Sequence, residues 1–128
     1  MSSIETSASA LAAQRLRMDL IANNLANAET SRTTDGGGPY QRMQAIFEAS
    51  ADGGVIVRDV LADPRPPQLV YQPGHPDADA NGYVAMPNVN AVEEMTDLIA
   101  ATRSYEANVT ALNASKAMTR KALEIGRG

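Results

Sequence analysis

Two stretches at opposite ends of the chain carry the clearest helical pattern of apolar and polar positions. Near the start, apolar residues recur every seven positions and others fill the neighbouring places, which predicts an amphipathic helix with one apolar seam. Near the end, apolar positions alternate at spacings of three and four, which predicts a second, longer amphipathic helix. The seam positions are Ile4, Leu11, Met18, Ile21 and Leu25 in the first helix and Met95, Leu98, Thr102, Tyr105, Val109 and Leu112 in the second.

The ends of both helices can also be placed. The first helix is expected to begin at residue 2 or 3 and to end near Asn27, because Asn can adopt the left-handed conformation that closes a helix. Asn90 with Glu93 three residues later is typical of the capping box that opens a helix, and Gly126 is expected to end it. At 1.5 Å per residue the helices measure roughly 36 Å and roughly 55 Å. The rest of the chain cannot cover the longer one.

The middle of the chain has the alternation and turn residues of β structure. Residues 40–47 predict a strand, and residues 55–61 predict its hairpin partner across an Asp-Gly-Gly turn. Three prolines then oppose regular pairing, so residues 68–72 are expected to form a short edge strand at most, and residues 73–87 a loop. The predicted fold class is mostly α with a small β-rich insert: long N- and C-terminal helices form a coiled-coil-like pair, and the middle is a short β-hairpin region.

The middle region has little apolar material for a core of its own. The whole chain holds one Phe and no Trp, so a single small core is the most it can support. An isolated amphipathic helix gains little stability from propensity alone, so both seams must be buried against each other, other copies or related chains. We expect residues 1–30 (N-terminal helix), 31–87 (β-rich and turn-rich) and 88–128 (C-terminal helix) to form one structural domain that assembles.

Charge and composition exclude several kinds of function. The chain has 11 basic and 15 acidic residues, a net charge of −4, so its overall charge gives no support to nucleic-acid binding. Its basic cluster, Lys116, Arg120, Lys121 and Arg127, complements the carbonyl end of the second helix. The lack of Cys excludes disulfides, thiolate metal sites and cysteine nucleophiles. We also expect no membrane span and no signal peptide, since the required apolar patterns are missing.

The best candidate for an ion site is the acidic loop after residue 76. Asp77, Asp79, Asn81 and Gly82 fit the first half of a calcium-binding EF-hand loop. The second half does not fit, because Asn88 stands where a bidentate Glu is required and prolines remove the flanking helices. An Asp-rich turn bonded to its own backbone is the favoured interpretation, although a small calcium-responsive module stays as a third hypothesis.

His75 is the only histidine, and it lies between Gly74 and Pro76 in a constrained turn. One imidazole rarely forms a metal site without partners, and no nucleophile motif accompanies it. A turn residue is therefore favoured over a general base. The sequence predicts no catalytic, cofactor-binding or metal-binding residues, no cofactor and no enzyme activity.

Residues 21–30, reading IANNLANAET, place three amides beside small alanines on a helix, although Asn is a mediocre helix former. This string resembles the amino-terminal signature of the flagellar axial proteins, which form the rod, the hook and the hook junctions. Residues 28–42, 73–90 and 93–118 resemble the subunits of the proximal rod, and RSYEAN at 103–108 is similar to a second axial signature. The middle segment is short for such a protein, so its outward-facing part is expected to be reduced.

The resemblance implies a structural subunit of the proximal rod, the drive shaft that transmits motor torque, with no catalysis. It also implies export through the flagellar type III apparatus without a cleaved signal peptide, and a place in the rod across the periplasm. Implied partners are other copies, other rod proteins, and the inner-membrane ring and export gate at the rod base. The expected assembly residues are Ile4, Leu11, Met18, Ile21, Asn23, Asn24, Leu25, Asn27, Met95, Leu98, Tyr105, Asn108, Val109 and Leu112. The alternative is a soluble helical adaptor that binds a partner through the same seam.

Overall fold

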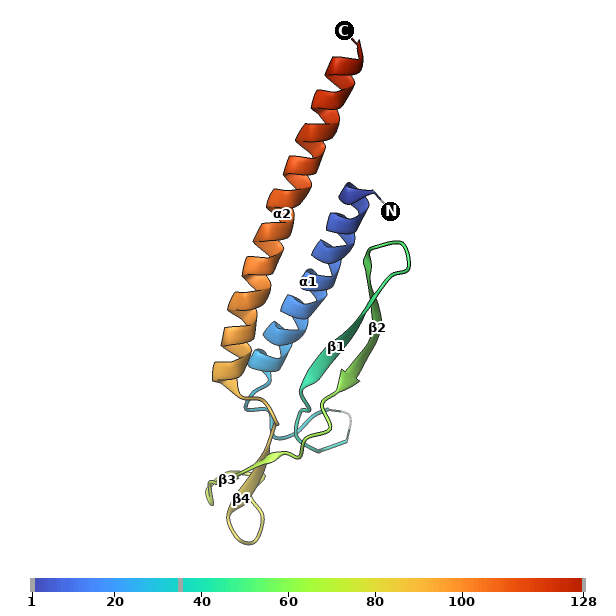
Figure 1. The fold of residues 1–128 in the computed structure, drawn as a ribbon. Coiled ribbons are helices and arrows are strands. Elements are labelled where there is room, and N and C mark those ends of the chain that lie inside the picture. The colour runs from blue at the N-terminus through green and yellow to red at the C-terminus, as the bar shows by residue number, and fades with distance from the viewer. Residues whose placement is uncertain (1, 35, 128) are drawn as a thin grey trace.

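The molecule is an elongated antiparallel pair of helices with two short β-hairpins (Figure 1). The computed structural model describes residues 2–34 and 36–127, so residues 1, 35 and 128 of the three expected regions lie outside it. The predicted fold class is confirmed. The elements are α1 (Ser3–Ala26), β1 (Met43–Ala49), β2 (Val55–Ala62), β3 (Gln68–Tyr71), β4 (Tyr83–Met86) and α2 (Ala91–Arg127).

Helix α1 begins where the sequence predicts, and a capping box fixes its start. The Ser2 hydroxyl accepts from the Glu5 N–H at 3.1 Å, and the Glu5 carboxylate accepts from the Ser2 N–H at 3.2 Å. The helix ends near Asn27, as expected. The prediction that Asn27 adopts the left-handed conformation is wrong, because its φ is −106° and its ψ is 14°. The Asn27 N–H donates to the Asn23 carbonyl at 3.1 Å and the Ala28 N–H to the Leu25 carbonyl at 3.2 Å, so backbone groups satisfy terminal carbonyls without a left-handed residue.

Helix α2 is capped by Asn90, as the sequence predicts. The Asn90 side-chain oxygen accepts from the N–H groups of Val92 at 3.0 Å and Glu93 at 3.1 Å. The expectation that Gly126 ends the helix is wrong, since α2 runs through it to Arg127 and Gly126 has no positive φ. The last turns of α2 are fully solvent-exposed, so no neighbouring element requires the chain to turn there.

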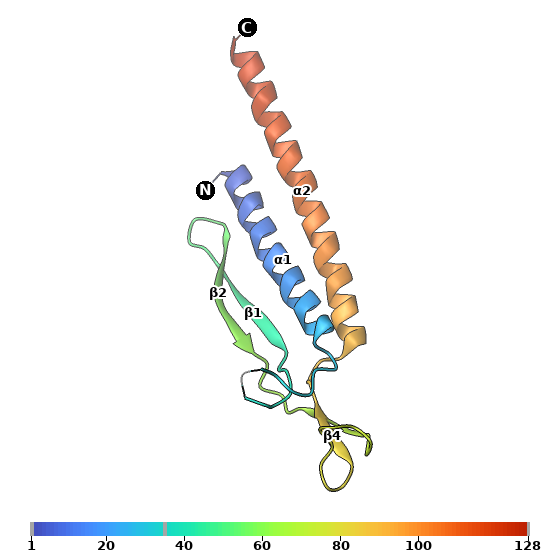
Figure 2. The same ribbon diagram turned by 180° about the vertical axis from the view of Figure 1, so that it is seen from behind.

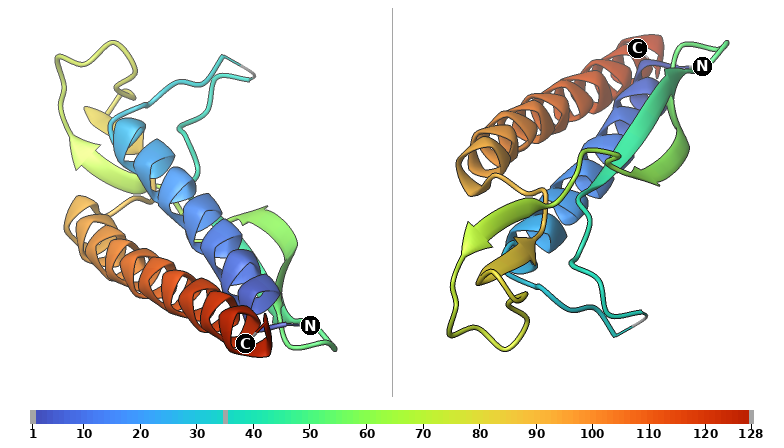
Figure 3. Two further views of the ribbon diagram at one scale, coloured as in Figure 1. Left: turned by 90° about the horizontal axis from the view of Figure 1, so that it is seen from above. Right: turned by 90° about the horizontal axis from the view of Figure 1, so that it is seen from below.

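Helix α1 lies between α2 on one side and the β1–β2 hairpin on the other (Figures 1 and 2). The predicted hairpin is confirmed, with Met43 opposite Ala62 and a register shift after Ile46 that leaves Arg58 as the extra residue on β2. The Val55 N–H donates to the Ser9 hydroxyl at 3.1 Å, which fastens the hairpin to α1. The end-on views show the same order of layers (Figure 3).

A second hairpin, β3–β4, forms an arm at the end of the molecule opposite the C-terminus (Figure 1). The expectation that residues 73–87 are loop throughout is wrong, because Tyr83–Met86 pair with β3. Four residues are too few for alternation to reveal a strand, and its turn residues dominate the segment. The strand pairs because Asp79 and Gly82 close the connecting turn: the Asp79 carboxylate accepts from the Tyr83 N–H at 2.9 Å, and Gly82 has φ +86°.

The apolar core within the described residues is small. Its buried hydrophobic residues are Ala13, Ile21, Val84, Val89 and Ala101. Many larger apolar side chains remain exposed on α2, β2 and the β3–β4 arm. A protein with so little buried apolar surface depends strongly on its polar contacts for a defined fold.

Gly82→Ala should loosen the β3–β4 arm. A Cβ at residue 82 would lie 2.8 Å from Cε1 of Tyr71 and 3.1 Å from Cβ of Pro73, and the backbone there has positive φ. Both effects oppose any side chain, so we expect a local cost of about 1–3 kcal/mol. Hydrogen exchange of the β3 and β4 amides measures it. Gly74→Ala is the control, because no atom lies within 4 Å of the Cβ it would add; equal protection in both variants would contradict the argument.

Candidate assembly site

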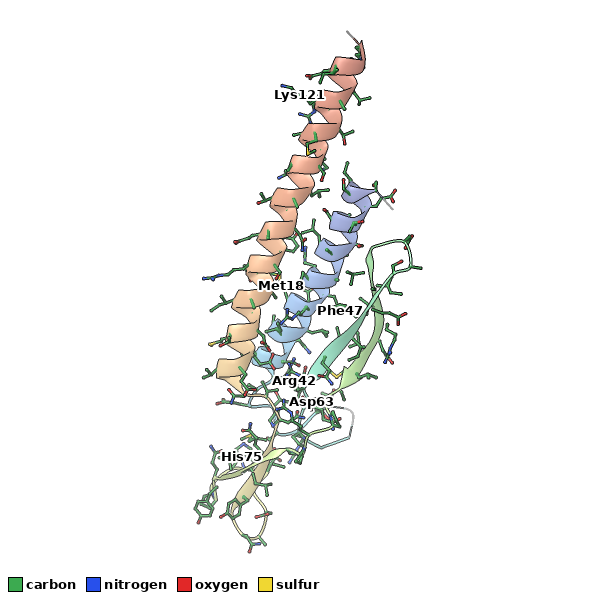
Figure 4. The ribbon with its side chains drawn as sticks, viewed as in Figure 1. Met18, Arg42, Phe47, Asp63, His75 and Lys121 are labelled. Atoms are coloured by element: carbon green, nitrogen blue, oxygen red, sulfur yellow. The ribbon has the colours of Figure 1, made fainter. Side chains whose placement is uncertain are left out.

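The facing sides of α1 and α2 form the seam that the sequence predicts. On α2 the residues turned towards α1 follow a heptad spacing, with Glu94 and Ala101 buried and Asn108 and Ser115 half-buried. On α1, Ile21 is buried and the other predicted seam positions are half-buried; Met18 is labelled in Figure 4. The expected assembly residues in this intrachain seam are Ile4, Leu11, Met18, Ile21 and Leu25 with Leu98, Tyr105, Asn108, Val109 and Leu112.

Four expected assembly residues lie outside the seam: Asn23, Asn24, Asn27 and Met95. The Asn24 side chain bonds to Met43 of β1, and the Asn27 side chain donates to the Asn23 carbonyl. Met95 is 56% exposed, and the buried position at this level of α2 belongs to Glu94, which is 1% exposed. Asn23 is also exposed. Within one chain, therefore, Met95 offers its side chain to the surroundings rather than to α1.

Asn24 explains why amides are placed on α1. Its side chain, 1% exposed, pairs with both backbone groups of Met43: it donates to the Met43 carbonyl at 2.9 Å and accepts from the Met43 N–H at 2.9 Å. On the edge of β1 that faces away from β2, the backbone of Met43 thus bonds to the Asn24 amide instead of to another strand. Because a buried backbone group without a partner is costly, this contact fixes where β1 meets α1.

Tyr40 completes the contact between α1 and the segment before β1. Its hydroxyl donates to the Asn24 side-chain oxygen at 2.7 Å and accepts from the Asn23 amide at 2.9 Å. Burial raises the pKa of Tyr40, and the hydrogen bond from Asn23 only partly opposes that effect. The Tyr40 phenol is therefore neutral and holds both asparagines.

Arg42 connects the same segment to α2. Its guanidinium donates to the buried carboxylate of Glu94 and lies 3.4 Å from an Asp63 oxygen and 4.0 Å from an Asp97 oxygen. Burial acts to lower the pKa of Arg42, but the hydrogen bond and charge of Glu94, with Asp63, outweigh it and raise the pKa. Among the described residues Arg42 is the only hydrogen-bond donor to the Glu94 carboxylate, whose second oxygen is buried without a partner.

Asn88 and Asp63 complete this network, and Asp63 lies next to Arg42 near the lower end of the helix pair (Figure 4). The Asn88 side chain accepts from the Arg42 N–H at 2.8 Å and donates to the carbonyls of Asp63 at 3.1 Å and Arg65 at 2.9 Å. The Asp63 carboxylate accepts from the Arg65 guanidinium at 2.9 Å, and these hydrogen bonds lower the pKa of Asp63. We call Asn24, Tyr40, Arg42, Asp63, Asn88 and Glu94 the polar junction.

The prediction that the acidic loop bonds to its own backbone is confirmed for Asp79 and is wrong for Asp77, whose carboxylate bonds to Ser31 and Arg32 outside the loop. The Asp79 carboxylate accepts from the N–H groups of Asn81 and Tyr83, both at 2.9 Å. Asp77 accepts from the Ser31 hydroxyl at 2.6 Å and from Arg32; these contacts, the Ser31 bond first, lower the pKa of Asp77. His75 Nδ1 accepts from the Asp77 N–H at 3.0 Å.

Residues 2–34 and 36–127 contain no cluster of three acidic, His or Cys side chains able to hold a metal ion. No helix in these ranges is long and apolar enough to cross a membrane.

Five members of the polar junction were not predicted from the sequence: Tyr40, Arg42, Asp63, Asn88 and Glu94. The contacts that join the members to one another span 16 to 52 positions, and no local periodicity marks them. The sequence carried only a weak signal for this network. A Glu on the inner face of α2 needs a cation as partner, and Arg42 is the basic residue nearest the start of β1.

Comparison with known proteins defines the class to which this arrangement belongs. Residues 4–32 match the family described as "Flagella basal body rod protein", and residues 80–125 match "Flagellar basal body rod FlgEFG protein C-terminal". Both matches fall on the terminal helices, and the second includes β4. The class is a structural, non-enzymatic protein of the flagellar rod that assembles with other rod subunits.

Full-length relatives narrow the class. This chain is 46% identical to the "Flagellar basal-body rod protein FlgC" of Borreliella burgdorferi, over 99% of this chain and 97% of the relative. It is 45% identical to the protein of the same name in Bacillus subtilis, over 98% of this chain and 97% of the relative. For the Salmonella typhimurium protein the identity is 48%, over 93% of this chain and 92% of the relative. The chain belongs to the FlgC family of flagellar basal-body rod proteins and is a structural subunit of the rod.

Asn24→Ala should destabilise the chain more than Asn23→Ala does. The first variant leaves the partly buried N–H and carbonyl of Met43 without partners, a cost of about 2–4 kcal/mol. The second removes one exposed hydrogen bond, a change within about 0.5 kcal/mol. Urea unfolding followed by circular dichroism measures both. Equal midpoints would mean that the Asn24 amide does not fix β1.

Arg42→Met should cost about 3–5 kcal/mol, because it leaves the Glu94 carboxylate buried without a counter-charge. Adding Glu94→Met should restore most of the lost stability, since the unpaired carboxylate is then removed and the buried Asp63 carboxylate keeps Arg65 as its partner. The free energy of unfolding of both single variants and the double variant measures the coupling. Arg58→Met on the exposed face of β2 is the control and should change stability by about 0.5 kcal/mol or less. Additive losses in the double variant would contradict the argument.

Proposed function

We propose that this rod subunit polymerises through its two terminal helices into the proximal part of the rod, and that the helices carry torque along this drive shaft. The observation that supports the proposal is the exposure of α2. Val92, Met95 and Ile99 are spaced as one stripe on the outer side of α2, and each is more than half exposed. An apolar stripe that the chain leaves uncovered marks a surface for a partner.

The same residues give a physical basis for stiffness. A large apolar side chain gains about 1.5–3 kcal/mol when a neighbour buries it fully. Sliding one subunit along another would expose these side chains again. Many such contacts along a helix oppose shear together, although each is small.

The proposal also covers where the subunit acts and what surrounds it. Its neighbours are other copies and other rod proteins, with the inner-membrane ring and the export gate at the rod base, and the rod spans the periplasm. The subunit is exported by the flagellar type III apparatus without a cleaved signal peptide. Resemblance to rod subunits supports these statements, and elongated helices suit passage through a narrow export channel.

Met95→Asp should leave the isolated fold intact and lower incorporation into rods. Met95 is 56% exposed, so unfolding of the free chain should change by about 1 kcal/mol or less. A buried subunit contact at this position would instead hold an uncompensated carboxylate. The measurement is quantitative mass spectrometry of purified flagellar basal bodies, with motility as a second readout. Val57→Asp, at an exposed apolar position on β2, is the matched control.

Three outcomes separate the possibilities. Stoichiometric wild-type chain with depleted Met95→Asp supports the proposal. Equal incorporation of both variants would show that the outer face of α2 is not an assembly surface. Absence of the wild-type chain from basal bodies, with a defined small complex in solution, would favour the helical adaptor.

A further inference from the structure

The loop that joins β3 to β4 contains the only Asn-Gly pair in the sequence, Asn81-Gly82. Every other Asn precedes a residue with a side chain, and that side chain shields the backbone N that follows the Asn. Gly82 gives no such shield, because glycine has no Cβ. Asn81 is exposed, and its loop lies at the end of the molecule opposite both termini (Figure 1).

An Asn followed by Gly is chemically labile in water. The backbone N of the Gly attacks Cγ of the Asn side chain, the new N–Cγ bond closes a five-membered imide, and the Cγ–Nδ2 bond breaks. The amide nitrogen leaves as ammonia and takes with it the proton of the backbone N–H. Water then opens the imide at either carbonyl, which leaves Asp or isoaspartate at the Asn position. Because the backbone N must lose its proton and reach Cγ, the rate depends on how freely this one peptide moves.

The fold itself favours glycine at residue 82. The φ of Gly82 is +86°, and a Cβ at this residue would lie 2.8 Å from Cε1 of Tyr71. A side chain that could shield the backbone N is therefore accommodated only with strain. The geometry that closes the turn thus also leaves Asn81 beside an unshielded backbone N.

In the folded arm, hydrogen bonds hold the backbone on both sides of the Asn81-Gly82 peptide. The Gly82 N–H donates to the Asp79 carbonyl at 3.0 Å, and the Gly82 carbonyl accepts from the Gln72 N–H at 2.9 Å. The Asp79 carboxylate accepts from the N–H groups of Asn81 and Tyr83, both at 2.9 Å. Attack on Cγ requires the Gly82 N–H to leave the Asp79 carbonyl, so the turn must open before the reaction can occur.

We propose that Asn81 is the site at which this chain deamidates, and that the reaction proceeds through openings of the turn between β3 and β4. The closed turn keeps the Gly82 N–H bonded to Asp79 and slows the reaction, and the open turn releases it. The reaction needs water and no partner chain, so it does not depend on rod assembly.

The product loosens the arm for two reasons. Residues 68–90 contain two acidic residues and neither Lys nor Arg, so a new carboxylate at residue 81 lies near Asp79 without a cation from this segment. Isoaspartate also adds one atom to the backbone just before residue 82. Tyr83 follows directly and pairs with Tyr71, so the added atom shifts β4 out of its register with β3. The edge-to-face contact of these two rings, whose centroids are 5.3 Å apart, is then lost.

Peptide mapping of the purified full chain by mass spectrometry tests the proposal. The chain is incubated in mildly alkaline buffer, with and without enough urea to unfold it, and Asp and isoaspartate are quantified at every Asn. We expect acid to form first at Asn81 in both conditions, and about tenfold or more faster in urea, where the turn is open. Asp79→Ala removes two hydrogen bonds that close the turn, so it should raise the rate in native buffer by about threefold or more and leave the rate in urea unchanged.

Two variants serve as controls. Gly74→Ala lies in the same loop, where an added Cβ meets no atom within 4 Å, and should change neither rate. Asn81→Gln lengthens the side chain by one carbon, so no five-membered imide can close and no acid should form at residue 81 over the same period. Hydrogen exchange should show lost protection of the β3 and β4 amides in the isoaspartate form. Four results would overturn the proposal: faster acid formation at another Asn in the folded chain, equal rates at Asn81 with and without urea, an unchanged native rate in Asp79→Ala, or unchanged protection of the isoaspartate form.

Discussion

The ion pair between Arg42 and Glu94 is the interaction on which the arrangement of this subunit depends. Glu94 is 1% exposed and lies in the first turn of α2, while Arg42 directly precedes β1. Burying a carboxylate is unfavourable unless a cation and hydrogen bonds compensate for lost water. The start of α2 therefore stays where Arg42 is, and Asn88 fixes Arg42 through its backbone N–H.

Residues 40–43 set the register of both helices. Asn24 of α1 bonds to Tyr40 and Met43, and Glu94 of α2 bonds to Arg42. The apolar seam alone would specify its register weakly, because the apolar residue buried in it on α2 is the small Ala101, which packs similarly after a shift. The polar junction removes that freedom, since a slip of either helix would leave a buried amide or carboxylate unpaired. Polar contacts thus define the geometry, and the apolar seam adds stability.

Sequence periodicity predicted what local pattern determines: both helices, the Ser2 region and Asn90 as helix starts, and the β1–β2 hairpin. It did not predict β4, whose four residues pair only because the Gly82 turn returns the chain to β3. Nor could it separate Asn24, which is buried, from Asn23, which is exposed, because adjacent helical residues with the same side chain carry the same local signal. The Arg42 network joins segments 21 or more positions apart, so it follows from the tertiary fold alone.

The division between polar junction and exposed apolar surface has a consequence for assembly. Few large apolar side chains are buried within one chain, yet α2 carries apolar residues on its outer side and at its free end. A helix with apolar residues on several sides is typical of a position inside a larger structure. The subunit keeps enough specific polar contacts to hold its two helices in register and, under the proposed assembly, leaves much of its hydrophobic burial to contacts with its neighbours. Folding and the proposed assembly then use different surfaces of α2, so substitutions on its outer side should weaken the rod more than the free subunit.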